Sequence, residues 1–401
     1  MMSYRYLLDI ALILLSTKLL SLLTRKFNLP QVVGALLAGV IMGPAMLNIL
    51  HGTEFIKQMA ELGVIVLMFT AGMESNLDDL KKSGKASFII ATLGVVIPLI
   101  GGTIVAYFFN NGEITNVSMT LQNIFIGIIL TATSVSITVE TLKELGKLTT
   151  KAGNAILGAA IIDDVLGILA LTVITSLADP NVNIVMCFLK IVLFFVCALI
   201  VGHFIHILFD KWTLKYNVDK RRFVIASFAV CLLFSFSAEQ FFGVADITGA
   251  FIAGLIFSQN NESSYMMARF ETVSYMLLSP MFFASIGIGI SVSKLDISTL
   301  VLTILLTLVA ILTKIIGCGL GAKLCGYTNK EVIQIGTGMI SRGEVALIVA
   351  SKGLDLGLMS NYFIPPVIIM VIITTVVTPV LLKIVFSDKN KIIGVKTQNY
   401  S

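Results

Sequence analysis

Charged residues are scarce in this chain. They make up 13% of its 401 residues, whereas hydrophobic residues make up 57%. Soluble globular domains usually carry about a quarter of their residues as charges. A composition this apolar excludes a water-soluble globular fold, and it predicts an all-α protein that crosses a membrane several times.

Cysteine is also rare. The five cysteines include no close CxxC pair, so the sequence indicates neither a disulfide framework nor a zinc site. The first apolar stretch, residues 6–23, is long enough to span a bilayer and has no small-residue cleavage site behind it. We therefore expect no cleavable signal peptide.

Motifs for nucleotides and nucleic acids are missing as well. The chain has no GxxxxGK[ST] run, which disfavours an ATP-driven pump. Its net charge of +5 is spread over short loops and the C-terminal tail, without a long basic arm. Nucleic acid is therefore not an expected partner, and we expect no chemical cofactor.

Apolar runs bounded by polar loops indicate about thirteen transmembrane helices, each near the ~20 residues needed to cross the hydrocarbon core. An odd number of spans puts the termini on opposite sides. Placing the C terminus inside assigns most of the 28 lysines and arginines to inside loops, as the positive-inside rule requires. The sequence thus predicts a protein of the cell (inner) membrane with its N terminus outside and its C terminus in the cytoplasm.

Two spans are interrupted by polar residues. In "IILTATSVSITVE" (128–140) Thr, Ser and Ala fill the middle, and in "TGMISRGEVALIV" (337–349) a Ser-Arg-Gly-Glu group breaks the apolar run. An odd number of spans separates the two interruptions, so the second unit is inverted relative to the first. Paired interrupted helices in inverted repeats indicate the midplane binding site of a transporter.

Ionisable residues lie at similar depth in three spans. Asp163 and Asp164 stand in the span 154–177, Lys314 in a later span, and Arg342 in the second interruption. Charges within a membrane are costly and are tolerated best when they face each other or water. Either aspartate is a candidate partner for Lys314. Because adjacent helical residues point about 100 degrees apart, both cannot face one lysine equally well.

A buried carboxylate suits the exchange of a cation for a proton, because the two compete for the same oxygens. Hydroxyls and freed carbonyls from Thr131, Thr133 and Ser134 would complete an oxygen shell for a hard cation. Arg342 and Glu344 would compensate the partial charges at the ends of the broken helices. Two alternatives stay open: a static ion pair, and hydroxyls that only bond the preceding helical turn.

Two other functions use some of the same residues. An intramembrane aspartyl protease needs two acids that face each other from separate helices, whereas Asp163 and Asp164 are neighbours that diverge. A sodium-coupled symporter of an organic anion would also use inverted broken helices, but only Lys314 and Arg342 would offer it positive charge. We therefore expect a transporter and not an enzyme.

Five blocks of sequence resemble a known family. They are "TATSVSITVETLKELGKLTT", "GAAIIDDVLGILAL", "VADITGAFIAGLIFS", "SPMFFASIGIGI" and "SRGEVALIVASKG". Together they resemble the monovalent cation:proton antiporter family (the second cation:proton antiporter group) with its NapA-type and GerN-type Na+/H+ exchangers, over about residues 5–386. The resemblance implies an NhaA/NapA-like fold with two crossed broken helices, a dimerisation domain and an elevator motion.

The resemblance also implies roles for the site. Asp164 would bind the ion and the proton, with Thr133 and Ser134 as further ligands of Na+, while Asp163 would pair with Lys314. The implied division of the single transmembrane unit 1–386 is a core domain at 86–177 and 298–386, dimerisation and panel helices at 5–73 and 222–292, and a linker helix at 184–209, followed by a cytoplasmic tail at 387–401.

We therefore predict a secondary, electrogenic antiporter that exchanges Na+ or Li+ for protons in the lipid bilayer and forms a homodimer. In the family that the sequence resembles, two adjacent aspartates at this position are typical of electrogenic members. A K+/H+ antiporter of the same fold is the alternative. Glu140, just after the first interruption, is a candidate for the ion's entrance, and Glu74 is expected on a solvated loop with nearby lysines.

Overall fold

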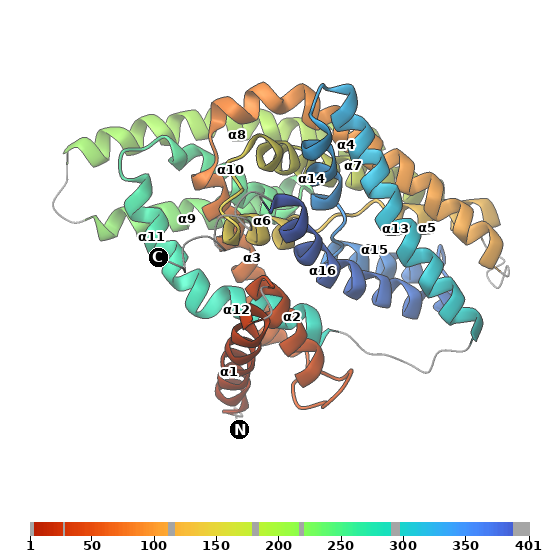
Figure 1. Ribbon diagram of the computed structural model, residues 1–401. Coiled ribbons are helices and arrows are strands. Elements are labelled where there is room, and N and C mark those ends of the chain that lie inside the picture. The colour runs from red at the N-terminus through yellow and green to blue at the C-terminus, as the bar shows by residue number, and fades with distance from the viewer. Residues whose placement is uncertain are drawn as a thin grey trace, which may run out of the picture.

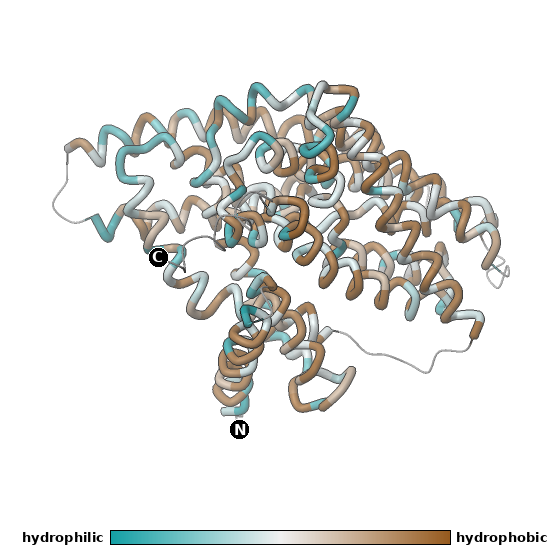
Figure 2. Tube along the Cα trace, viewed as in Figure 1, coloured by the Kyte–Doolittle hydropathy of each residue, from teal (hydrophilic) through white to brown (hydrophobic). Residues whose placement is uncertain are grey.

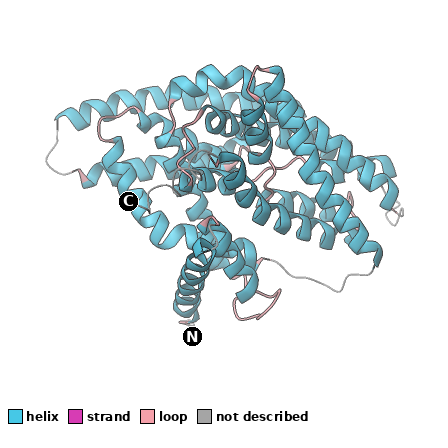
Figure 3. Ribbon diagram, viewed as in Figure 1, coloured by secondary structure: helices cyan, strands magenta, loops and turns pink. Residues whose placement is uncertain are grey.

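The computed structural model describes residues 4–26, 29–110, 117–178, 184–215, 220–289 and 297–387, and most of these residues are helical. These ranges contain no β-strand (Figure 3), which confirms the all-helical prediction for them. The α-helices are α1 (Arg5–Lys26), α2 (Gln31–Met42), α3 (Glu54–Glu74), α4 (Leu77–Phe109), α5 (Met119–Ile129), α6 (Val135–Glu144), α7 (Lys151–Ala178), α8 (Ile184–Lys215), α9 (Arg221–Ser237), α10 (Asp246–Ser258), α11 (Ser263–Val273), α12 (Ser279–Ile288), α13 (Ile297–Leu324), α14 (Asn329–Gly338), α15 (Glu344–Asp355) and α16 (Ile364–Phe386). Three short elements complete them, the π-helical η1 (Ala238–Phe242) and η2 (Ser274–Leu278) and the 3-10 helix η3 (Asn361–Phe363).

Nine helices of the described residues are long and apolar enough to cross a membrane. They are α1, α3, α4, α7, α8, α9 with η1, α11 with η2 and α12, α13, and η3 with α16, and Figure 2 shows apolar residues along much of their length. Four further apolar helices, α2, α5, α10 and α15, are shorter than the ~20 residues of a full span. The prediction of a multi-pass membrane protein is confirmed, while the count of about thirteen spans and the inverted repeat stay predictions.

The helices pack in two groups (Figure 1). The first helix group consists of α1, α2, α3, α9, α10, α11 and α12, in which α3 lies against α10 and α12. The second helix group consists of α4, α5, α6, α7, α13, α14, α15 and α16, in which α4 lies against α5, α7 and α13. The long helix α8 contacts α7 of the second group and α10 of the first.

Glycines let the central helices of each group approach closely. A Cβ atom at Gly72 of α3 would lie 2.2 Å from the carbonyl oxygen of Phe251 in α10. A Cβ atom at Gly317 of α13 would lie 2.6 Å from the carbonyl oxygen of Leu93 in α4. Larger residues would hold these backbones apart. Small residues at helix crossings are typical of membrane bundles, where close packing drives association.

Polar residues fix the starts of α4 and α14. The Asn76 side chain accepts hydrogen bonds from the N–H groups of Asp78 and Asp79, so α4 begins at Leu77, before the apolar run that starts near residue 86. Thr328 forms a capping box with Glu331 at the start of α14. The apolar runs of the sequence therefore mark the membrane part of a helix and miss its polar first turns.

Candidate functional site

Two pairs of helices in the second helix group are the halves of interrupted helices. α5 ends at Ile129 and α6 begins at Val135, while α14 ends at Gly338 and α15 begins at Glu344. The connecting residues are mostly buried and not helical. Both interruptions lie inside the two segments in which the sequence predicted them.

The two interruptions meet and bond each other. The backbone N–H of Ser134 donates to the carbonyl oxygen of Ser341 at 2.8 Å, and the Ser341 hydroxyl donates back to the carbonyl oxygen of Ser134 at 2.8 Å. A Cβ atom at Gly343 would lie 2.8 Å from the Ser134 hydroxyl oxygen, so this approach requires glycine. Unwound backbone inside a membrane is tolerated only when the protein supplies such partners.

Arg342 is fully buried and donates to carbonyl oxygens on both sides of the crossing. Its guanidinium group reaches the oxygens of Leu130 at 2.7 Å, Ile340 at 3.0 Å and Ala310 at 3.4 Å. The carbonyl oxygen of Arg342 in turn accepts a bond from the Thr375 hydroxyl of α16 at 2.5 Å. A delocalised cation thus faces the negative ends of peptide dipoles that the interruptions leave without helical partners.

A buried ion pair lies one helical turn from this crossing. The ammonium group of Lys314 donates to Asp163 Oδ1 at 2.8 Å, and both side chains are almost fully buried. Ala310, which bonds Arg342, precedes Lys314 by one turn of α13. The residues alone left either aspartate as the partner of Lys314, the family resemblance implied Asp163, and the structure shows Asp163 in that place.

Gly94 of α4 makes room for this ion pair. A Cβ atom there would lie 3.7 Å from Lys314 Nζ and 3.9 Å from Asp163 Oδ1, and only 2.5 Å from the Cys318 sulfur. With side chains 0% and 1% exposed, the pair is enclosed by the protein, and Gly94 and Cys318 lie beside it. In such surroundings, the loss of either partner leaves an uncompensated buried charge, which is strongly destabilising.

The remaining predicted ligands differ in what they contact. Asp164, next to Asp163 on α7, is half-buried. The Thr131 hydroxyl donates to the carbonyl oxygen of Ile128 at 2.8 Å, which is the bond to the preceding turn that the sequence left open. The Thr133 hydroxyl is buried and has no hydrogen-bond partner within the described ranges, and α5 and α6 both contact α7. The side chain of Glu344 lies outside the described residues.

Several contributors to this region have no sequence signal. Gly94, Cys318 and Thr375 lie in apolar helices without a motif, and only tertiary packing brings them to the site. Glu74, expected on a solvated loop with nearby lysines, is the last residue of α3 and half-buried, and its carboxylate lies 3.8 Å from the ammonium group of Lys143 on α6. That contact joins residues far apart in sequence, so a local charge pattern does not reveal it.

A multi-pass helical bundle with a buried aspartate–lysine pair beside two interrupted helices has the architecture of a secondary membrane transporter. The chain belongs to the sodium/hydrogen exchanger family, because the family model described as "Sodium/hydrogen exchanger, transmembrane" matches residues 11–387.

Relatives align over nearly the whole chain. The Na(+)/H(+)-K(+) antiporter GerN of Bacillus cereus is 37% identical, over 97% of this chain and 98% of the relative. The Na(+)/H(+) antiporter of Enterococcus hirae is 36% identical, over 93% of this chain and 96% of the relative. The solved structure of the sodium proton antiporter MjNhaP1 from Methanocaldococcus jannaschii superposes with a TM-score of 0.66 at 19% identity, over 94% of each chain. That last likeness extends to the fold alone.

Proposed function

We propose that this chain is a secondary antiporter that exchanges Na+, or Li+, for protons. One observation carries the proposal: of two adjacent aspartates on α7, Asp163 is held by buried Lys314, while Asp164 is half-buried on a neighbouring face. This division gives Asp163 a cationic partner, and we propose that Asp164 is the acid that serves the cation beside the interruptions. The relatives are named as Na+/H+ antiporters, which supports the same function.

The proposed mechanism is competition at Asp164. Its carboxylate binds either a proton or a dehydrated cation, and the cation also needs neutral oxygen ligands. The Thr133 hydroxyl supports this role because it is buried and has no hydrogen-bond partner among the described residues, a costly state for a polar group unless a ligand completes it. Ser134 supplies backbone and hydroxyl oxygen beside it. No resident cofactor takes part in this exchange.

Electrogenic transport requires that protons and the cation carry unequal amounts of charge across the membrane in each cycle. We propose that cation binding at Asp164 releases Lys314 from Asp163, and that re-formation of this pair accompanies cation release. If Lys314 exchanges its proton in this step, two protons move for each Na+. The buried, water-poor setting of the pair supports such coupling, because a change at one acid alters the balance at the other.

Potassium is the second candidate cation. GerN, the Na(+)/H(+)-K(+) antiporter, is named for K+ as well as Na+. We therefore propose Na+ as the main substrate and K+ as the alternative to be measured beside it.

The proposed transport movement carries the second helix group past the first, as a core domain moves past dimerisation and panel helices with α8 as the linker. The protein acts as a homodimer in the cell membrane, with the N terminus outside and the C terminus in the cytoplasm. The packing of the helices in two groups supports this division.

The deciding experiment is cation-driven proton flux in proteoliposomes that contain the purified protein. Na+, Li+ and K+ are compared, and the membrane voltage is clamped with valinomycin in the Na+ and Li+ measurements. We expect voltage-dependent proton flux with Na+ that Asp164→Asn abolishes. The matched control is Asp79→Asn, which removes the same charge from an exposed pair with Lys82 and should keep the parental flux. Absence of cation-driven flux in folded parental protein would refute the antiporter proposal.

A further inference from the structure

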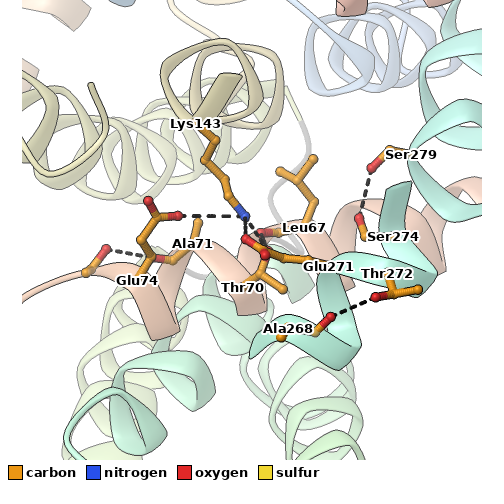
Figure 4. Close-up of polar contacts among 11 residues, drawn as sticks. Leu67, Thr70, Ala71, Glu74, Lys143, Ala268, Glu271, Thr272, Ser274 and Ser279 are labelled. Carbon is orange, nitrogen blue, oxygen red and sulfur yellow. Dashed lines mark hydrogen bonds and ion pairs between the residues drawn. The ribbon is translucent and has the colours of Figure 1, made fainter. Parts of the chain in front are cut away.

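Lys143, near the end of α6, contacts two helices of the first helix group. Its ammonium group lies 3.8 Å from Glu74 and donates to the Thr70 hydroxyl at 3.1 Å, both on α3, and it lies 3.6 Å from Glu271 on α11. Figure 4 shows the Lys143 side chain pointing between these partners. The Lys143 side chain is 14% exposed, so the lysine is more enclosed than in an ordinary surface ion pair, while Glu271 stays about half exposed.

Glu144, the next residue, makes a second contact to the same group. Both of its carboxylate oxygens lie 2.8 Å from the backbone N–H of Gln31, the first residue of α2. The N-cap of α2 is Pro30, which provides no side-chain bond to the helix start. A carboxylate from α6 therefore caps α2 and faces the positive end of its dipole.

These two contacts connect the first helix group to the transport site through one short helix. α6 has 10 residues, about 15 Å in length, and it begins directly after Ser134, which bonds the other interruption. A movement of the second helix group past the first must break or replace the contacts of Lys143 and Glu144. A movement at the interruption is likewise transmitted to them along α6.

A cavity of about 950 Å³ lies beside these contacts. Its walls come from both groups and include Glu140, Lys143 and Glu144 of α6, Ala35 of α2 and Glu271 of α11. In this conformation, therefore, the contacts of Lys143 and Glu144 are formed while the space between the two helix groups is open near the C-terminal end of α6.

We propose that Lys143 and Glu144, with Thr70, Glu74, Glu271 and Gln31 as partners, form a latch that holds the conformation with this cavity open. The latch rests on the proposed function, because it presupposes that one helix group moves past the other during transport. It sets the population of the open conformation, and with it the apparent affinity for a cation that enters through the cavity.

Cross-linking tests whether the latch must open. In a variant without the five native cysteines, Lys143→Cys with Glu271→Cys is bridged by a bifunctional thiosulfonate reagent in proteoliposomes. We expect Na+-driven proton flux to fall at least fivefold and to return after reduction. The control pair, Lys151→Cys with Glu331→Cys, replaces a Lys–Glu ion pair inside the second helix group and should keep its flux when bridged. Unchanged flux in the bridged 143–271 variant would overturn the proposal.

A second measurement does not depend on transport. Ala35→Cys, in the cavity wall, is alkylated with a soluble maleimide in the parental background and in Lys143→Gln, Lys143→Arg and Lys151→Gln. We expect Lys143→Gln to slow alkylation at least threefold, because the open conformation loses its latch, while Lys143→Arg and Lys151→Gln keep the parental rate. Equal rates in all four would refute the latch. Absent flux in the parental protein would refute the proposed function alone, and alkylation would still decide the latch.

Discussion

At the scale of single residues, Lys314 and Asp163 depend on each other. Lys314→Gln removes the charge that is bonded to the Asp163 carboxylate, whose side chain is 1% exposed. An unpaired buried charge typically costs roughly 3–5 kcal/mol. We expect a loss of thermal stability of that order, measured by the unfolding of the purified protein in detergent.

The double variant Asp163→Asn with Lys314→Gln provides the control. It removes both charges and leaves two amides of similar size, so we expect it to be more stable than Lys314→Gln alone. If the single variant unfolds at the parental temperature, the ion pair contributes nothing to folding.

The sequence indicated this pair only in part. Charges inside apolar runs identified Asp163, Asp164 and Lys314 as residues of the site, because their cost in a membrane demands a partner. Helix geometry left the choice between the aspartates open, since a helical step of about 100 degrees says only that one of them faces the lysine, and it was the family resemblance that implied Asp163. Gly94 and Cys318 complete the enclosure, yet their place depends on how α4 packs against α13, which a linear pattern does not contain.

At the scale of elements, Arg342 holds the two interrupted helices together. Lysine at this position keeps the charge but loses the planar fork that reaches the carbonyl oxygens of Leu130 and Ile340. Each buried carbonyl left without a donor costs on the order of 1–3 kcal/mol. We expect Arg342→Lys to lower the thermal unfolding temperature clearly.

The matched control is Arg269→Lys, because Arg269 is exposed on α11 and stacks over Tyr265. That variant should unfold at the parental temperature. Equal unfolding of Arg342→Lys and Arg269→Lys would contradict the role assigned to Arg342.

The positions of both interruptions were predictable, because polar residues in an apolar run break the helical pattern within a few residues. Their bonds to each other were not. Ser134 and Ser341 are distant in sequence, and their mutual hydrogen bonds arise only when the two broken helices cross. The same holds for Lys143, whose partners come from two other helices.

The capping box of α14 predicts a pH-dependent contribution to stability. Burial raises the pKa of Glu331, but bonds from the N–H and hydroxyl of Thr328 and the charge of Lys151 lower it, and the net pKa lies below its ordinary 4.5. A carboxyl group whose pKa is lower in the folded state than in the unfolded chain stabilises the fold at pH values above its unfolded-state pKa. This stabilisation is complete above about pH 4.5 and disappears as the pH falls through the folded value.

We therefore expect Glu331→Gln to be less stable than the parent at neutral pH and to approach it in acid, as measured by thermal unfolding in detergent. Thr328→Ala removes the cap hydroxyl and should cost about 0.5–2 kcal/mol at neutral pH. A gap between Glu331→Gln and the parent that stays constant from neutral to acid pH would contradict the capping argument.

At the scale of the whole molecule, the positive charges predict how the bundle sits in the membrane. The contact between Lys151 and Glu331 puts the starts of α7 and α14 at one end, and the contact between Lys143 and Glu74 puts the end of α3 beside the end of α6. Loops rich in lysine stay in the cytoplasm, so these ends should be internal.

Cysteine labelling tests this orientation in intact cells. In a variant without the five native cysteines, an impermeant maleimide added outside should label Lys57→Cys, an exposed position near the start of α3. It should label Lys151→Cys, exposed at the start of α7, only after the membrane is permeabilised. The reverse pattern would mean that the lysine-rich end faces outward. Cations entering the cavity beside Lys143 would then come from outside, and the latch would hold an outward-open conformation.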